Sequence, residues 1–187
     1  MRKYPLVIWS PSEISAVLAA CGTTRTGRRN AALVAMLAGT ALRCSEALAL
    51  ELADVDLSRG VVQVRCGKNS KHRTVGIGES ALAHLRAWLG VRGIGPGLLF
   101  VTSRGAPILP SYVRSLLPRL ASRAGYEKRL HAHALRRSLA YRMHRAQVPL
   151  ATIQKCLGHS NVATTSVYID DGGSAEVIDA MRAAEVA

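Results

Sequence analysis

Apolar residues dominate the pattern of this chain, and their spacing predicts helices along most of its length. The segment "NAALVAMLAGTALRCSEALALELADV", residues 30–55, has apolar residues on every side of a helix, which is typical of a helix buried in the core. We expect this helix to break near Gly39 and Thr40, and a second one to run from about Arg43 to Leu50. The preceding "GTTRTGRR" is predicted to be a turn.

Six other segments are predicted to be helical. The first begins at "SPSE", where Ser10 or Ser12 can cap the helix. The others are "ESALAHLRAWLGV" (79–91), "SYVRSLLPRLASRAG" (111–125), "HAHALRRSLAYRMHRAQ" (131–147), "PLATIQKCLGH" (149–159) and "SAEVIDAMRAAEV" (174–186). We expect Pro118 to interrupt one helix and Pro149 to start another.

Three short β-branched or apolar runs predict strands. "GVVQVRC" (60–66) and "HRTVGIG" (72–78) flank the turn "GKNSK" and together predict a β-hairpin, while "GLLFVTS" (97–103) predicts one further short strand. The expected fold is therefore mostly α with a small antiparallel β-sheet. With 187 residues, the chain is long enough for one domain with its own core.

The net charge of the chain indicates what kind of molecule it binds. The net charge of +13 and the pI near 10.5 indicate a polyanion, of which nucleic acid is the commonest; the alternative is an ordinary basic surface. Ten lysines and arginines between Arg114 and Lys155 share that stretch with a single acidic residue, Glu127. Such a block can neutralise several phosphates at once.

The remaining composition excludes several classes. The four cysteines are scattered without a C-x-x-C pair, which argues against zinc and disulfides and fits a reducing cytoplasm. The opening "MRKYPLVIW" has too short an apolar region for a signal peptide. No apolar run reaches membrane-spanning length, so we expect no membrane association.

Several polar residues are candidates for chemistry. Arg43 enters an apolar segment, where it can simply pair with Glu46 three residues later. His133 and Arg136 also lie three residues apart and thus share a helix face, although a helix-start histidine and a solvated arginine would look the same. Together they offer a phosphate a bidentate donor and a proton carrier. His131 and His133 lack a third ligand nearby, so we expect no metal.

A tyrosine near the C-terminus has the most demanding chemistry. Tyr168 is a poor nucleophile at its free pKa of about 10, and an ordinary buried tyrosine is the alternative. If it attacks a phosphodiester, cations must favour the phenolate and stabilise the charge that develops on the phosphorus group. The hairpin lysines Lys68 and Lys71, and His159 after a predicted helix end, also have ordinary structural explanations.

Taken in order, these residues resemble one known set. Arg43 in "ALRCSEALAL", Lys68 in "GKNSKHR", His133 and Arg136 in "HALR", His159 in "LGHS" and Tyr168 in "TTSVY" are similar to the catalytic residues of the tyrosine recombinases, the phage integrase and Xer family. The likeness runs from "SPSEI" to the last predicted helix. It implies the catalytic-domain fold of that family, double-stranded DNA as partner, a dimer or tetramer on DNA, and a cytoplasmic, nucleoid-associated location.

The resemblance also implies a role for each residue. Tyr168 would attack DNA and form a 3′-phosphotyrosine link without a metal or ATP. Arg43 and Arg136 would hold the non-bridging oxygens, and His159 would bind the phosphate. His133 would manage the tyrosine proton, and Lys68 would protonate the leaving 5′-oxygen.

Three departures from the family pattern bear on these roles. Arg137 stands where a second histidine is common, and it can contact phosphate or face solvent. Asn69 replaces a glycine of the hairpin turn, which leaves Lys71 as an alternative to Lys68. We expect residues 1–187 to be a single catalytic domain without the family's N-terminal core-binding domain. The predicted helix of residues 174–187 is expected to dock on this chain or to be exchanged between protomers.

Other functions remain open from the sequence. The same chemistry serves a topoisomerase of type IB, which relaxes DNA without exchanging strands. A catalytically silent DNA-binding regulator could use the same fold. A metal nuclease built on "HAH" is the remaining alternative.

Overall fold

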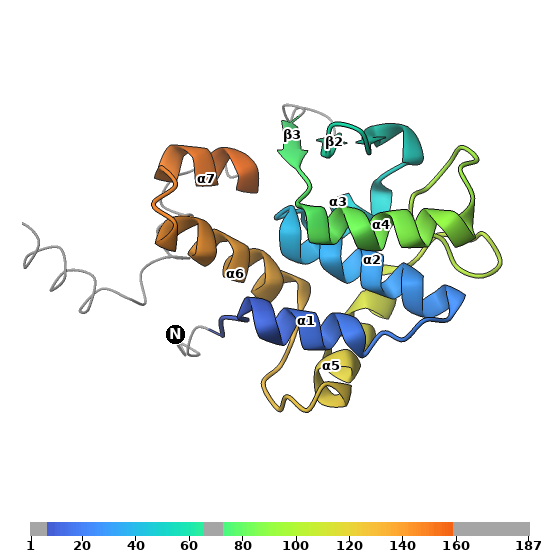
Figure 1. The fold of residues 1–187 in the computed structure, drawn as a ribbon, viewed down its shortest axis with the longest axis horizontal. Helices are drawn as coiled ribbons and strands as arrows, with labels where there is room; N and C mark the ends of the chain where they lie inside the picture. The colour runs from blue at the N-terminus through green and yellow to red at the C-terminus, as the bar shows by residue number, and fades with distance from the viewer. Residues whose placement is uncertain (1–6, 66–72, 159–187) are drawn as a thin grey trace, which may run out of the picture.

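The structure is a computed structural model that describes residues 7–65 and 73–158. Of the six predicted catalytic residues, Arg43, His133 and Arg136 lie within these ranges, and two of the predicted helices, 149–159 and 174–186, extend beyond them. The positions outside the described residues are Lys68, Asn69, Lys71, His159, Tyr168 and the segment 174–187. The described part is mostly helical with one small antiparallel sheet, as the sequence predicts (Figure 1).

Helix α2 (Arg25–Gly39) forms the centre of the fold. It packs against α1 (Pro11–Ala19), α4 (Glu79–Arg92) and α6 (Ala132–Arg145), and its contact with α4 is the most extensive (Figure 1). Its side chains from Ala31 to Ala38 are all buried, as expected for a helix that is apolar all round. The predicted break follows Gly39, and the short helix α3 (Cys44–Ala49) comes after it.

The turn predicted for residues 22–29 is shorter than expected, because the helix already begins at Arg25. The Thr24 hydroxyl accepts a 3.1 Å hydrogen bond from the Gly27 amide and thereby caps the helix. Gly27 lies so close to the preceding turn that a Cβ there would stand 2.4 Å from the Gly22 carbonyl oxygen. Glycine thus lets the first turn of α2 pack beneath that loop. The cap of α1 is Ser10, which forms a capping box with Glu13.

The sheet has three antiparallel strands in the order β1-β2-β3 among the described residues: β1 (Val55–Asp56), β2 (Val61–Val64) and β3 (Arg73–Gly76). The predicted hairpin strands pair with Val62 opposite Val75 and Val64 opposite Arg73. Strand β1 was not predicted; it is only two residues long and follows the 3₁₀ turn η1 (Leu52–Asp54).

The predicted strand at 97–103 is wrong. This segment makes only the isolated bridges Glu51–Leu98 and Val101–Pro107. It is buried for another reason: the Leu99 carbonyl accepts a 2.9 Å hydrogen bond from the indole N–H of Trp88, and both side chains are in the core. The apolar run therefore reflects burial against α4 and not membership of a sheet.

The predicted interruption at Pro118 is also wrong, since α5 (Pro110–Arg123) runs straight through it. A proline inside a helix removes one backbone hydrogen bond. The helix nevertheless buries Leu116, Leu117 and Leu120 in the core, and this tertiary packing outweighs the local preference.

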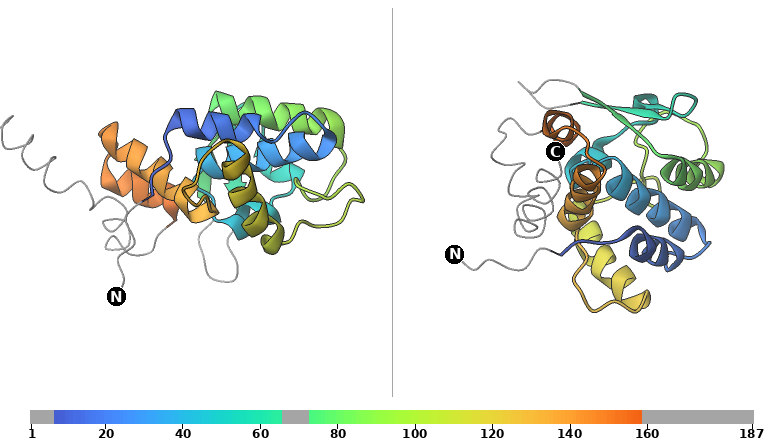
Figure 2. Two further views of the ribbon diagram at one scale, coloured as in Figure 1. Left: turned by 90° about the horizontal axis from the view of Figure 1, so that it is seen from below. Right: turned by 60° about the vertical axis from the view of Figure 1, so that its left-hand side comes forward.

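Helices α6 and α7 (Leu150–Leu157) lie together at one end of the molecule, with β3 beside α7 (Figure 2). Pro149 caps α7, as predicted. The two helices share a small apolar cluster that contains Ala140, Ile153 and Leu157. No helix in the described ranges is long and apolar enough to cross a membrane.

The packing of α4 on α2 gives a stability prediction. Leu85 on α4 is 0% exposed, so Leu85→Ala leaves a cavity and lowers the free energy of unfolding by about 2–5 kcal/mol. Ile94→Ala is the control, because this side chain is 85% exposed and its truncation changes stability by less than about 0.5 kcal/mol. Urea denaturation measures both, and equal losses would contradict this account of the core.

Candidate functional site

Arg43 stands at the N-terminus of α3, directly after the break in the central segment. Its backbone N–H and its guanidinium both donate to the Glu46 carboxylate, at 2.7 and 2.8 Å. The pairing with Glu46 that the spacing suggested is thus present. The guanidinium makes a second contact as well, because Nη2 donates to the Gly158 carbonyl at 3.0 Å. With its side chain 45% exposed, Arg43 can still be reached by a ligand.

Arg136 reaches the same place from α6. It is only 3% exposed, which rules out the solvated arginine that the sequence left open. Its Nη1 donates to the Ala41 carbonyl and its Nη2 to the Leu157 carbonyl. A buried guanidinium is costly unless its donors find acceptors, so these carbonyls hold Arg136 in place.

Arg73, the first residue of β3, was not among the predicted site residues. Its Nη1 and Nη2 donate to the two carboxylate oxygens of Glu46 at 3.0 and 2.7 Å. Its Nε donates to the Cys156 carbonyl at 3.2 Å. The side chain is 11% exposed. Only its place in "KHR", at the base of the hairpin, could have singled it out in the sequence.

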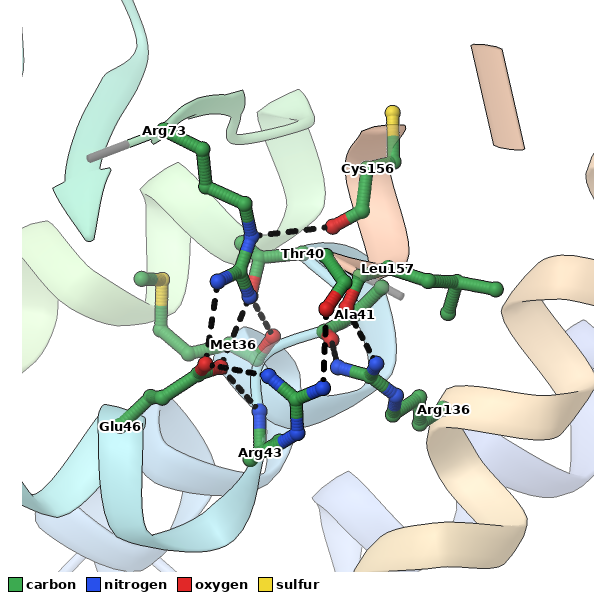
Figure 3. Close-up of polar contacts among 10 residues, drawn as sticks. Met36, Thr40, Ala41, Arg43, Glu46, Arg73, Arg136, Cys156 and Leu157 are labelled. Carbon is green, nitrogen blue, oxygen red and sulfur yellow. Dashed lines mark hydrogen bonds and ion pairs between the residues drawn. The ribbon is translucent and has the colours of Figure 1, made fainter. Parts of the chain in front are cut away.

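The three arginines meet at the C-terminal end of α7. The carbonyls of Cys156, Leu157 and Gly158 are consecutive, and each accepts a hydrogen bond from a different arginine (Figure 3). The last carbonyls of a helix lack partners within the helix and carry partial negative charge. The end of α7 therefore gathers cations from α3, β3 and α6 around one point.

Glycine is favoured at position 158 for two reasons. Its φ of 62° lies in the left-handed region, where glycine is favoured. A Cβ at this position would also lie 2.9 Å from the Arg73 Nη1 atom. A side chain in "LGHS" would thus require the Arg73 guanidinium to shift from its present contacts.

Glu46 is the acidic member of this cluster. Burial raises the pKa of Glu46, but hydrogen bonds from Arg73 and from the Arg43 backbone and side chain outweigh it and bring the pKa to about 2. The carboxylate is therefore ionised throughout the neutral range. This one carboxylate accepts hydrogen bonds from both Arg43 and Arg73 and so links the two side chains.

His133 lies on α6 one turn before Arg136, with an exposed side chain. Partial desolvation lowers its pKa, and the charges of Arg137, His131 and Arg136 lower it further. The imidazole is consequently neutral at pH 7. Arg137 is half-buried, and its charge acts on both histidines.

His131 has a structural role as the N-cap of α6. Its Nδ1 accepts a 3.1 Å hydrogen bond from the Ala134 amide, and its ring stacks on that of His133 with the centroids 6.2 Å apart. Because Nδ1 must be unprotonated to accept, neutral His131 carries its proton on Nε2.

The described part of the predicted site is therefore assembled as follows. Arg43 and Arg136 come together at the end of α7, and His133 shares a helix with Arg136. Gly158, the last described residue, directly precedes His159 in the sequence. The arrangement presents guanidinium donors and a neutral imidazole, a combination suited to a phosphate group.

The sequence profile of the phage integrase family matches residues 9–173, and the chain belongs to this family. Its fold is that of a tyrosine recombinase catalytic domain. The crystal structure of XerA recombinase superposes with a TM-score of 0.84 at 30% identity, over 97% of this chain and 66% of that one. The catalytic domain of bacteriophage HP1 integrase shares the fold, with a TM-score of 0.58 at 20% identity.

Among curated relatives, the chain is 37% identical to tyrosine recombinase XerC 2 of Ralstonia nicotianae over 175 residues. It is 34% identical to tyrosine recombinase XerC of Xylella fastidiosa over 169 residues. These alignments cover 89% and 90% of this chain but 50% and 57% of the relatives. The chain thus spans about half the length of the curated relatives it matches.

The His131 cap predicts a pH-dependent stability. Desolvation, with the charges of Arg137 and Arg129, lowers the pKa of His131 below 6.5. A lowered pKa in the folded state means that the neutral cap stabilises the protein fully above pH 6.5. This stabilisation is lost as the pH falls through the folded value. His131→Asn keeps a cap that does not titrate, so the stability of the wild type relative to this variant falls on acidification.

His131→Ala is the matched variant, because it removes the cap at every pH and costs about 1 kcal/mol at pH 8. Urea denaturation at pH 8 and pH 5 measures all three proteins. On acidification, the wild type approaches His131→Ala. A constant difference between the wild type and His131→Asn would show that this cap does not titrate.

Proposed function

We propose that this protein is a site-specific DNA recombinase that cleaves and rejoins DNA through a 3′-phosphotyrosine intermediate. The observation that carries the proposal is the meeting of Arg43 and Arg136 at the end of α7. These guanidinium groups come from residues 93 positions apart in the sequence, and they converge directly before His159. Membership of the phage integrase family supports the same conclusion.

The proposed cleavage begins when a phosphate clamp, formed by the Arg43 and Arg136 guanidinium groups, binds DNA. Arg43 and Arg136 bind the non-bridging oxygens of one DNA phosphate, and His159 donates a further hydrogen bond. Fixed cations around the phosphate stabilise the charge that builds up in the transition state. Because Arg136 is buried and held by two carbonyls, its geometry is set before DNA arrives.

Bond making and breaking then balance around the phosphorus atom. The Tyr168 oxygen forms a bond to phosphorus, and the bond from phosphorus to the 5′-oxygen breaks. His133 accepts the phenolic proton, for which the lowered pKa of this histidine provides a neutral acceptor at pH 7. Lys68 gives a proton to the leaving 5′-oxygen. Attack by the 5′-hydroxyl of a second strand reverses these steps and needs neither a metal nor ATP.

The partner of this site is double-stranded DNA, and the protein acts as a dimer or tetramer on it. The net charge of +13 supports a polyanionic partner, and relatives named XerC are tyrosine recombinases. Residues 1–187 serve as the catalytic domain, with 174–187 available for exchange between protomers, and the protein works at the cytoplasmic nucleoid.

The nucleophile is tested with a DNA substrate that traps cleavage. DNA fragments bound by the protein are selected from the source genome, and a nicked duplex is made from them so that the released strand diffuses away. The wild type forms a covalent adduct in the presence of EDTA, which denaturing gels detect. Tyr168→Phe binds the DNA but forms no adduct, because only the phenolic oxygen is lost. Relaxation of plasmids without the selected site would instead favour topoisomerase activity.

The general acid is tested by changing the leaving group. Lys68→Ala slows cleavage of normal DNA, and a 5′-bridging sulfur at the scissile phosphate restores the rate, because a thiolate leaves without protonation. Lys71→Ala is the matched variant from the same turn and cleaves both substrates at nearly the wild-type rate. If sulfur rescues Lys71→Ala and not Lys68→Ala, Lys71 is the acid.

A further inference from the structure

One arginine of the cluster lies outside the set of residues assigned to the chemistry. Arg73 contacts Glu46 through both terminal nitrogens and the Cys156 carbonyl through Nε. It thereby joins three elements that are distant in the sequence: β3, α3 and α7. Glu46 lies 27 positions away from Arg73 and Cys156 lies 83 positions away.

We propose that Arg73 is a positioning residue that fixes the Arg43 guanidinium relative to the end of α7. Arg43 and Arg73 share the Glu46 carboxylate, and they also share the last turn of α7, where they donate to Gly158 and Cys156. The two arginines are therefore held to each other twice, once through an anion and once through the helix end. The inference rests on the proposed recombinase chemistry.

The geometry needs an arginine and not merely a positive charge. A guanidinium presents donors in a rigid plane, so its end can bind both carboxylate oxygens while Nε points to a carbonyl. An ammonium group is a point charge on a flexible chain and cannot hold both partners in this fixed relation. The missing side chain at Gly158 leaves the space that the Arg73 guanidinium occupies.

Arg73 also connects the clamp to the hairpin. It is the first residue of β3 and follows Lys68 by five positions in the sequence. Its contacts thus fix the base of the hairpin against α3, which begins after Arg43, and against α7, whose end also binds Arg136. In the proposed chemistry, Arg73 sets the position of the phosphate clamp without touching the phosphate.

The test compares Arg73→Lys with Arg92→Lys. Arg92 is the last residue of α4, and that end of α4 lies away from α7 (Figure 1). It is also an arginine held by carbonyls, since it donates to Gly95 and Leu98 at 2.9 and 2.7 Å. Single-turnover cleavage is measured at saturating DNA. Arg73→Lys slows cleavage by up to roughly 100-fold, as a misplaced catalytic group does, with DNA affinity nearly unchanged. Arg92→Lys cleaves at the wild-type rate.

A second substrate separates positioning from a general structural defect. In a methylphosphonate at the scissile position, a neutral methyl group replaces one anionic oxygen, so the clamp contributes less to the reaction. The ratio of the wild-type cleavage rate to the Arg73→Lys cleavage rate is therefore smaller on this substrate than on normal DNA. An unchanged rate ratio would overturn the inference, because a damaged fold slows both substrates alike.

Glu46 provides an independent check of the same linkage. Glu46→Gln keeps the shape but removes the charge that both arginines share, and it reproduces the slow cleavage of Arg73→Lys. The double variant is no slower than the slower single variant, because both changes break one linkage. Glu13→Gln is the control, since Glu13 forms a comparable pair with Lys128 in another part of the fold. Fully additive losses would contradict the linkage.

A measurement without DNA distinguishes failure of this inference from failure of the proposed function. Hydrogen exchange of the Arg43 side-chain N–H groups, followed by NMR, is faster in Arg73→Lys than in the wild type or Arg92→Lys. An unchanged exchange rate overturns the positioning role. Faster exchange in Arg73→Lys, combined with no covalent adduct in the wild type on any selected site, overturns the recombinase function and leaves the structural linkage intact.

Discussion

The hydrogen bonds between arginines and the last carbonyls of α7 are the contacts on which the site depends. A helix end leaves carbonyls without partners, and its dipole favours positive charge. Arginines supply hydrogen-bond donors and positive charge here: Arg73 donates to the Cys156 carbonyl, Arg136 to that of Leu157 and Arg43 to that of Gly158. The helix end and the cations therefore stabilise each other. Removing one arginine would weaken the placement of the other two, in addition to its own contacts.

This arrangement reconciles burial with reactivity. Arg136 is almost fully buried, where a guanidinium is stable only with its donors satisfied. Carbonyls satisfy them with partial charges, so they orient the group without the full neutralisation that a carboxylate would bring. Glu46, the carboxylate of the cluster, instead binds Arg73 and Arg43. A phosphate entering beside α7 would thus meet oriented cations, which is the preorganisation that charge stabilisation requires.

The sequence predicted the local features of this fold well. Four of them follow from residues close together in the chain: the serine cap of α1, the break after Gly39, the pairing of β2 with β3, and the start of α7 at Pro149. The predictions at Pro118 and at 97–103 were wrong because contacts with the core decided the local structure there. These contacts with the core cannot be predicted from the local pattern of residues.

The same distinction applies to the site. The types and order of Arg43, His133 and Arg136 could be recognised in the sequence, because a motif records which residues are present. The burial of Arg136 could not be predicted, since it depends on carbonyls 95 and 21 positions away. Arg73 was missed for the same reason. Its partners come from two other elements, and only the tertiary fold brings them together.

The break in the central segment follows from what the site requires. If α2 continued past Gly39, Arg43 would be part of that helix and would not stand at the start of α3. Instead, Ala41 takes a φ of 55°, a left-handed conformation that costs about 1–2 kcal/mol for a residue other than glycine.

Two contacts offset this strain: the Arg136 guanidinium binds the Ala41 carbonyl, and the Ala41 side chain packs in the cluster with Ile153 and Leu157. Both contacts come from α6 and α7, the helices that also form the rest of the site. The strained turn, and with it the position of Arg43, is therefore stabilised by α6, which packs on α2, and by α7, which packs on α6 and β3. Formation of the clamp is therefore coupled to the docking of these helices.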